Sequence, residues 1–124
     1  MEFKGTKGGW KVKHSESKNS WNIIGTALGG RYKISKCDYI INNELSNDIN
    51  NREIQEQQAN AMLISKAPEM LEMLNKAKVE LSRIKGSMMA HPDCTIGSEF
   101  DDYTSSAQEC ENEIELFIKQ ATEL

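Results

Sequence analysis

Apolar residues recur at alternating steps of four and three in two stretches of the chain, a spacing typical of amphipathic helices. The first stretch contains Met70, Leu74, Ala77, Leu81, Ile84 and Met88. The second contains Tyr103, Ala107, Cys110, Ile114, Phe117 and Ala121. Two such helices joined by a loop pack as an antiparallel hairpin. We therefore predict this hairpin, with a core at Leu74, Leu81, Ile84, Ile114 and Phe117.

Proline and glycine suggest where the helices begin and end. Pro68 suits the first turn of a helix, so Ala67-Pro68 predicts a break. Gly86 is typical of the residue that follows a helix, which ends the first hairpin helix near Lys85. The last helix is expected to open at Asp101, Asp102 or Thr104.

A further helix is predicted before Pro68, over residues 52–66, with Asn50 or Asn51 as its N-cap. Its inner side is expected to hold Ile54, Gln58, Ala61, Met62 and Ser65. Small and polar residues make this side less apolar, so the sequence predicts weaker packing of this helix against a core.

The N-terminal part shows the period of strands instead. Apolar and polar residues alternate in residues 10–14 and 31–37, and residues 21–28 are rich in β-branched and aromatic side chains. A polar turn at residues 15–20 and Gly29-Gly30 would connect these strands. We predict a three-stranded antiparallel meander over residues 9–40.

The expected fold is therefore α+β in a single domain, residues 1–124, with the β-meander in residues 1–40 and helices in residues 52–124. Residues 38–51 between them are rich in Asn, Asp and Ser. The hydrophobic content of 38% and the aromatic content of 6% indicate a lean core. A lean core is consistent with a chain that awaits a partner.

Charge is distributed unevenly along the chain, whose formal net charge is −4. Residues 1–40 contain eight Lys or Arg and three acidic residues, a balance of +5. Residues 41–124 contain seven basic and sixteen acidic residues, a balance of −9. The N-terminal sheet is therefore the basic part of an acidic protein.

Strand alternation places the basic residues on one face of this sheet. Lys11 and Lys13 point away from Trp10 and Val12 by this rule. Arg31 and Lys33 likewise point away from Tyr32 and Ile34, whose side is also assigned Lys36. We predict that Lys11, Lys13, Arg31 and Lys33 form a face that binds an RNA-bearing or acidic partner. The competing interpretation is a sheet with aromatic residues as core and lysines as solubilising edges.

Candidate reaction chemistry is sparse. His91, Asp93 and Cys94 are the one cluster with metal-ligand side chains, but zinc sites use paired ligands and an ordinary loop is favoured. No nucleophile motif is present, and the carboxylates of the last helix spread around it. We expect a protein that is not an enzyme, with no cofactor and no metal.

Three cysteines without paired spacing, Cys37, Cys94 and Cys110, indicate free and mostly buried thiols in a reducing cytoplasm. The first residues lack the apolar stretch of a signal peptide, and no apolar run approaches the roughly 20 residues of a membrane span. We therefore expect a cytoplasmic protein.

Two segments resemble sequences of small phage and prophage proteins. Residues 59–74, Ala-Asn-Ala-Met-Leu-Ile-Ser-Lys-Ala-Pro-Glu-Met-Leu-Glu-Met-Leu, are similar to a helical-hairpin pattern of the form ANAxLIxxAPExLExL. Residues 3–10, Phe-Lys-Gly-Thr-Lys-Gly-Gly-Trp, resemble the N-terminal lead-in of such proteins, especially those of Bacteroidetes phages. Together the segments cover part of the chain, and they include no catalytic residue.

The resemblance implies phage origin, and many small phage proteins without enzyme motifs bind a host machine. It implies an anti-CRISPR-type inhibitor of a host RNA-guided nuclease effector, with or without its guide RNA. The RNA-targeting type VI effector is one candidate target. The alternative is a nucleic-acid-binding phage accessory or regulatory protein, which the basic strands would serve.

Overall fold

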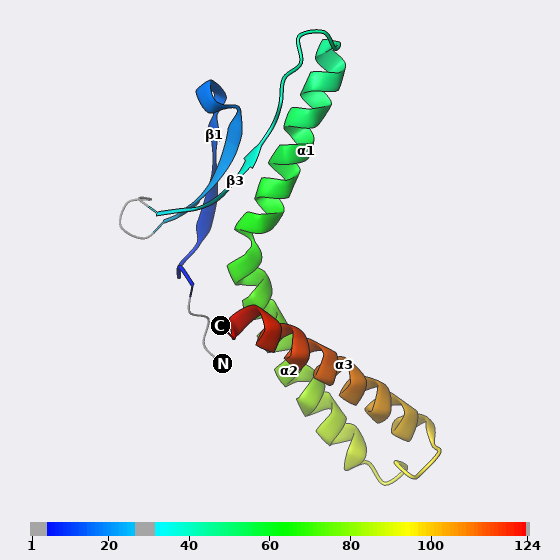
Figure 1. Ribbon diagram of the computed structural model, residues 1–124. Coiled ribbons are helices and arrows are strands. Elements are labelled where there is room, and N and C mark those ends of the chain that lie inside the picture. The colour runs from blue at the N-terminus through cyan, green and yellow to red at the C-terminus, as the bar shows by residue number, and fades with distance from the viewer. Residues whose placement is uncertain (1–4, 27–31, 124) are drawn as a thin grey trace. The chain divides into compact units, whose positions relative to one another are not determined.

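The computed structural model describes residues 5–26 and 32–123 (Figure 1). It has three strands followed by three α-helices, which confirms the predicted α+β class and element order. The chain forms two compact units that meet in sequence between Glu69 and Met70. The sheet and α1 belong to the first unit, and most of α2 and all of α3 belong to the second. Each unit is described by itself.

The three strands form an antiparallel sheet in the order β1-β2-β3. They are β1 (Trp10–Ser15), β2 (Ser20–Gly25) and β3 (Tyr32–Asp38), so the predicted meander is confirmed. A 3₁₀ turn, Glu16–Lys18, joins β1 to β2, and Asn19 closes it at a φ of 49°. Asparagine tolerates this left-handed conformation better than most residues. The predicted Gly29-Gly30 connector and Arg31 lie outside the described residues.

A β-bulge interrupts the pairing of β2 with β3. Ile23 pairs with Ser35 and Ile24 pairs with Lys33, so Ile34 is the extra residue. An extra residue reverses the alternation of side chains on either side of it. Lys33 and Lys36 therefore lie on the same face, and the prediction that Lys36 lies with Ile34 on the opposite side was wrong.

Helix α1 (Asn47–Ser65) begins earlier than predicted. Its N-cap is Ser46, whose Oγ accepts a hydrogen bond from the Ile49 amide at 3.4 Å. The prediction that Asn50 caps the helix was wrong. Its side chain instead forms hydrogen bonds with the preceding loop. Its Oδ1 accepts from the Asn42 amide at 3.2 Å, and its Nδ2 donates to the Asn42 carbonyl at 3.1 Å.

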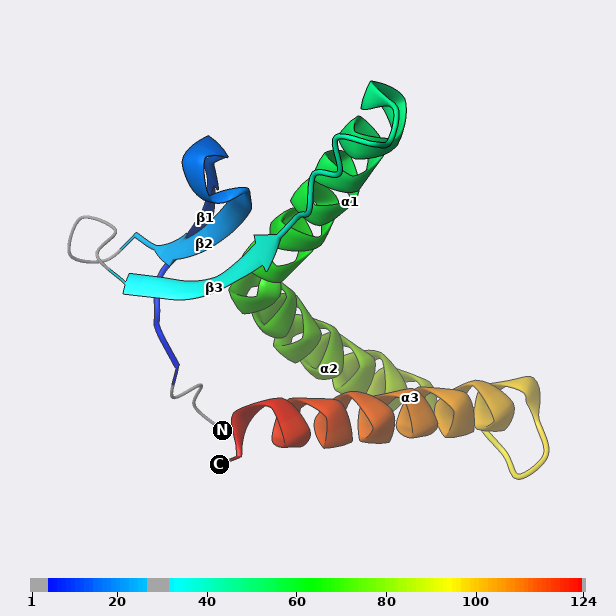
Figure 2. The same ribbon diagram turned by 45° about the horizontal axis from the view of Figure 1, so that its top comes forward.

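Helix α1 packs against one face of the sheet (Figure 2). Trp21 Nε1 donates a hydrogen bond to the Ile54 carbonyl at 3.2 Å, and Ile23 beside it on β2 is fully buried. On the helix side, Ala61 and Ser65 are buried as predicted. Met62, which was predicted to point inward, is 54% exposed.

Helices α2 (Ala67–Met89) and α3 (Glu99–Thr122) are both longer than predicted. A single residue, Lys66, separates α1 from α2, which confirms the break beside Pro68. Gly86 lies inside α2 and does not end it, so the predicted C-cap was wrong. The N-cap of α3 is Ser98, whose Oγ accepts from the Asp101 amide at 3.2 Å.

The two helices pair antiparallel, as predicted (Figure 1). Lys85 Nζ lies 2.8 Å from Glu111 Oε2, and Lys78 Nζ lies 3.6 Å from Glu115 Oε1. Lys85 also donates a hydrogen bond to Gln108. As residue numbers fall along α2, their partners rise along α3, which is the antiparallel register.

The predicted core of this hairpin was only partly right. Leu74, Leu81 and Ile114 are half-buried between the helices. Ile84 is 43% exposed and Phe117 is 58% exposed, so these two were wrong. The inner face of each helix is the less exposed side, which includes ion-paired residues. These faces contain Leu71, Leu74, Lys78, Leu81, Lys85 and Met88 on α2 and Thr104, Ala107, Glu111, Ile114, Ile118 and Thr122 on α3.

No helix in the described part of the chain combines the length and the apolar character that crossing a membrane requires.

Candidate functional site

The sheet face that points away from α1 has four exposed lysines. Cross-strand pairs place them in two rows, because directly paired residues share a face. One row runs Lys11, Ile24, Lys33 and the other runs Lys13, Asn22, Lys36. We call Lys11, Lys13, Lys33 and Lys36 the basic face.

Three of the four residues predicted for partner binding can be placed. Lys11, Lys13 and Lys33 are exposed and lie on this one face, as strand alternation predicted. Arg31, the fourth, lies outside the described residues. Lys36 was missed because the bulge at Ile34 reverses the alternation, and the sequence around residue 34 has no glycine or proline to signal a bulge.

One acidic side chain lies near the edge of the basic face. Lys36 Nζ is 3.3 Å from Asp38 Oδ2, and both side chains are 56% exposed. Such an exposed pair contributes little to stability because water screens it. The other three lysines have no acidic partner among the described ion pairs, so the face keeps a strong positive charge.

Asn22 lies in the middle of the second lysine row. Its Oδ1 is buried and has no hydrogen-bond partner among the described residues. An unsatisfied buried acceptor costs about 1–3 kcal/mol. A donor that reaches this oxygen would therefore be favoured.

The aromatic residues belong to the other face of the sheet. The Trp21 ring stacks on His14, with ring centroids 3.9 Å apart and planes at 12°. His14 Nε2 lies 2.7 Å from the hydroxyl of Tyr39, which is buried. Trp21 is thus held by its cross-strand neighbour and by α1. It is core rather than a free platform for base stacking, as the competing interpretation of the sequence had it.

Trp10 also points to the α1 side of β1, and its Nε1 donates to the Thr6 carbonyl at 3.0 Å. The side chain of Tyr32 lies outside the described residues. The basic face is therefore characterised by charge, with Ile24 and Asn22 between the lysines, and not by aromatic rings.

The loop with His91, Asp93 and Cys94 forms its own local structure. His91 Nδ1 accepts a hydrogen bond from the Asp93 amide at 3.1 Å, and the His91 ring stacks on Phe100 at 4.7 Å. Across the described residues, no three His, Cys, Asp or Glu side chains gather in a way that could hold a metal ion.

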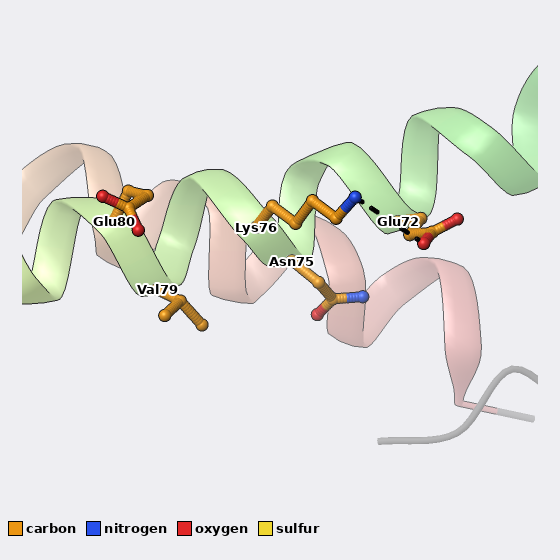
Figure 3. A pocket seen from close by; sticks show the side chains of 5 residues that line it. All are labelled: Glu72, Asn75, Lys76, Val79 and Glu80. Atoms are coloured by element: carbon orange, nitrogen blue, oxygen red, sulfur yellow. Dashed lines mark ion pairs between the residues drawn. The ribbon is translucent and has the colours of Figure 1, made fainter.

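A hollow of about 400 Å³ is open and lies along a single helix (Figure 3). It is lined by Glu72, Asn75, Lys76, Val79 and Glu80, all from α2. Glu72 and Lys76 form an ion pair across it at 3.9 Å, with both side chains about two-thirds exposed. A ligand site normally encloses most of its ligand between several elements, and this hollow does not.

The three cysteines are free thiols. Cys37 and Cys94 are half-buried, and Cys110 is exposed, so the prediction that Cys110 faces the inner side of the hairpin was wrong. Cys37 pairs with Trp21 across β2 and β3 and lies on the α1 side.

Sequence comparison relates the chain to a phage protein family. The family model described as Salmonella phage P22 protein Y8K6 matches residues 1–122. No curated protein and no solved structure matches the sequence. Since the family match extends over nearly every residue, the chain belongs to the family of Salmonella phage P22 protein Y8K6.

Proposed function

We propose that this phage protein is a counter-defence inhibitor that acts by binding and not by catalysis. Its partner would be a host RNA-guided nuclease effector, the kind of protein that anti-CRISPR proteins inhibit, in the host cytoplasm. An RNA-targeting type VI effector is the first to test. The basic face is the observation that carries the proposal, because it is an exposed, charged surface on a sheet whose other face packs against α1.

The support begins with the rigidity of the scaffold. The α1 side of the sheet is anchored by the Trp21–Ile54 hydrogen bond and by buried Ile23. The lysines on the opposite side therefore need not contribute to the core. Residues that are free of a structural role can serve binding at little cost to stability.

Charge gives the second line of support. Four lysines in two neighbouring rows create a local positive potential on a protein whose net charge is −4. Such a patch attracts phosphates or clustered carboxylates and raises the association rate at low salt. An effector that holds a guide RNA offers both kinds of anion.

The test is a charge-reversed variant in which Lys11, Lys13, Lys33 and Lys36 are all replaced by Glu. Cells that express an RNA-guided effector and the wild-type protein should lose immunity to a targeted phage. Cells that express the reversed variant should retain it, and the variant should no longer copurify with the effector. Circular dichroism should show the same fold for both proteins.

The matched control reverses four other charges that are exposed and lie outside the sheet, those of Arg52, Lys66, Lys76 and Lys119. This variant should inhibit like the wild type. If the wild-type protein leaves phage targeting intact for every defence system tested, the inhibitor proposal is wrong. If the reversed variant still inhibits fully, binding lies elsewhere, and the acidic outer side of α3 is the next surface to test.

A nucleic-acid-binding accessory or regulatory protein is the second candidate, and the two lysine rows favour it. Four phosphate contacts to single-stranded RNA predict a slope of about −3 for log K against log salt. Affinity should then fall about 50-fold between 50 and 200 mM salt. Gel shifts at these two concentrations test this, and no binding at the lower one removes this candidate.

A further inference from the structure

The α2–α3 hairpin has a set of exposed apolar side chains along one side. We call it the outer apolar face, and it consists of Met70, Ala77, Ile84, Tyr103, Cys110 and Phe117. Its large members are 43–58% exposed. Single exposed apolar residues are ordinary, but several along one side of a helix pair are typical of an interaction surface.

This face lies on one flank of the helix contact that contains the ion pairs. Ala77 and Ile84 each precede a lysine of the ion-pair side, Lys78 or Lys85, and one residue turns a helix by about 100°. On α3, Cys110 similarly precedes Glu111. Because the two helices run antiparallel, the residues that precede inner-face residues lie on the same flank of the helix contact in both helices.

The hairpin itself has little core. Among its described residues, Ile118 is the one apolar side chain that is nearly fully buried, together with Thr104 and Thr122. Polar contacts and a few half-buried leucines account for the rest of the helix contact. Two helices with so little buried apolar surface gain substantially from a further layer.

Spacing on the face is that of a helical bundle. Met70, Ala77 and Ile84 are seven residues apart, and so are Tyr103, Cys110 and Phe117. Residues seven apart lie on the same side of a helix, so each helix presents one row of apolar side chains to a further helix. Two further helices that lie along these two rows would cover the face and complete a four-helix bundle.

Large and small side chains alternate across the face. The ion pairs Lys78–Glu115 and Lys85–Glu111 set the register of the two helices. By this register Ala77 lies level with Phe117, and Ile84 lies level with Cys110. Each level thus pairs one large side chain with one small one.

We propose that a second copy of this chain covers the outer apolar face. A two-fold axis along the hairpin places α2 of one copy over α3 of the other. Phe117 then packs against Ala77 of the partner subunit, and Ile84 packs against Cys110 of the partner subunit. Both contacts fill a small position with a large side chain, which is what close packing needs.

The size of the face agrees with this pairing. A face about 30 Å long and about 20 Å wide buries roughly 600 Å² of each copy, at the lower end for specific dimers.

The first test is solution mass. Light scattering coupled to size-exclusion chromatography should give twice the 14.0 kDa chain mass for the wild type. Phe117→Glu should give the monomer mass with unchanged helix content. Leu116→Glu is the matched control, because Leu116 is 57% exposed on the same helix but outside this face, and it should remain a dimer.

Other occupants of the face would give different results. A wild-type protein that is monomeric at every concentration up to the submillimolar range overturns the proposal. If it is monomeric and Phe117→Glu lowers its melting temperature independently of concentration, the rest of the same chain covers the face instead. A dimer that survives Phe117→Glu places the interface elsewhere and also overturns the proposal.

A second test locates the contact. Two variants lack Cys37 and Cys94, and one of them also has Ile84→Cys with Cys110→Ser. After these are mixed and oxidised, a disulfide that joins one copy of each variant must be intermolecular. We expect this mixed species to predominate over both same-variant species, and its absence from a dimeric sample would contradict the two-fold arrangement.

Discussion

At the scale of single residues, two glycines have opposite conformational roles. Gly86 lies inside α2 with ordinary helical backbone, and a Cβ built there meets nothing within 4 Å. Gly97 has a φ of +83° in the loop before α3. Side-chain-bearing residues rarely adopt that conformation.

Gly86→Ala should therefore stabilise the protein by about 0.5–1 kcal/mol, since glycine in a helix interior is costly. Gly97→Ala is the paired comparison and should destabilise it by a similar amount, because its backbone would be strained. Thermal unfolding of both variants checks this. A fall in melting temperature for Gly86→Ala would show that residue 86 is not within a helix.

At the scale of elements, the hairpin shows how a polar pair can lie inside a helix contact. Lys85 and Glu111 have side chains only 17% and 14% exposed, and they meet at 2.8 Å. Partly buried charges need each other, because losing one leaves the other desolvated and unpaired. Replacing one of these two residues should therefore lower the stability of the protein more than replacing both.

Lys85→Met should cost on the order of 1–3 kcal/mol, since Glu111 loses its partner within a partly buried site. The double variant with Lys85→Met and Glu111→Leu should recover most of this loss, because two apolar side chains pack without a desolvation penalty. Urea unfolding of both single variants and the double variant provides the comparison. Additive losses would mean that the two side chains do not interact in solution.

Neighbouring residues on α3 should also differ strongly in their effect on stability. Ile118 is 6% exposed and Leu116 is 57% exposed. Ile118→Ala should cost about 2–4 kcal/mol by leaving a cavity, while Leu116→Ala should change stability by less than about 0.5 kcal/mol. Chemical denaturation measures both losses, and equal losses would contradict the placement of Ile118 on the inner face of α3 and of Leu116 on its exposed side.

At the scale of the whole molecule, positive charge is concentrated on an acidic protein. The basic face combines lysines from β1 and β3, which are separated by about twenty residues in the sequence. Binding of polyanions depends on such local clusters more than on net charge. The protein should therefore bind a polyanion although its net charge is −4.

Heparin chromatography tests this expectation. The wild type should be retained at low salt and elute as salt screens the contact. The variant with all four lysines of the basic face reversed to Glu should pass through. The control with Arg52, Lys66, Lys76 and Lys119 reversed should still be retained, and loss of its retention would show that net charge alone is responsible.

Periodicity along the chain was enough to determine the kinds of elements and their order. Strand alternation and the 3–4 helical stripes depend on each segment alone, so the meander, the hairpin and the break beside Pro68 were predictable. The same alternation put Lys11, Lys13 and Lys33 on one face. Helix ends were predicted less well, because Ser46 and Ser98 compete with several nearby Asn and Asp residues as caps.

Tertiary structure decided which neighbours each face meets. The bulge at Ile34 brought Lys36 onto the basic face, because pairing with β2 and not the sequence of β3 determines where an extra residue fits. The rotation of α2 and α3 left Ile84 and Phe117 exposed. A stripe of apolar residues has two flanks. Here the flank beside the ion pairs Lys78–Glu115 and Lys85–Glu111 faces the other helix, and the opposite flank is exposed. Such pairs form only when two distant segments come together, so no local pattern predicts them.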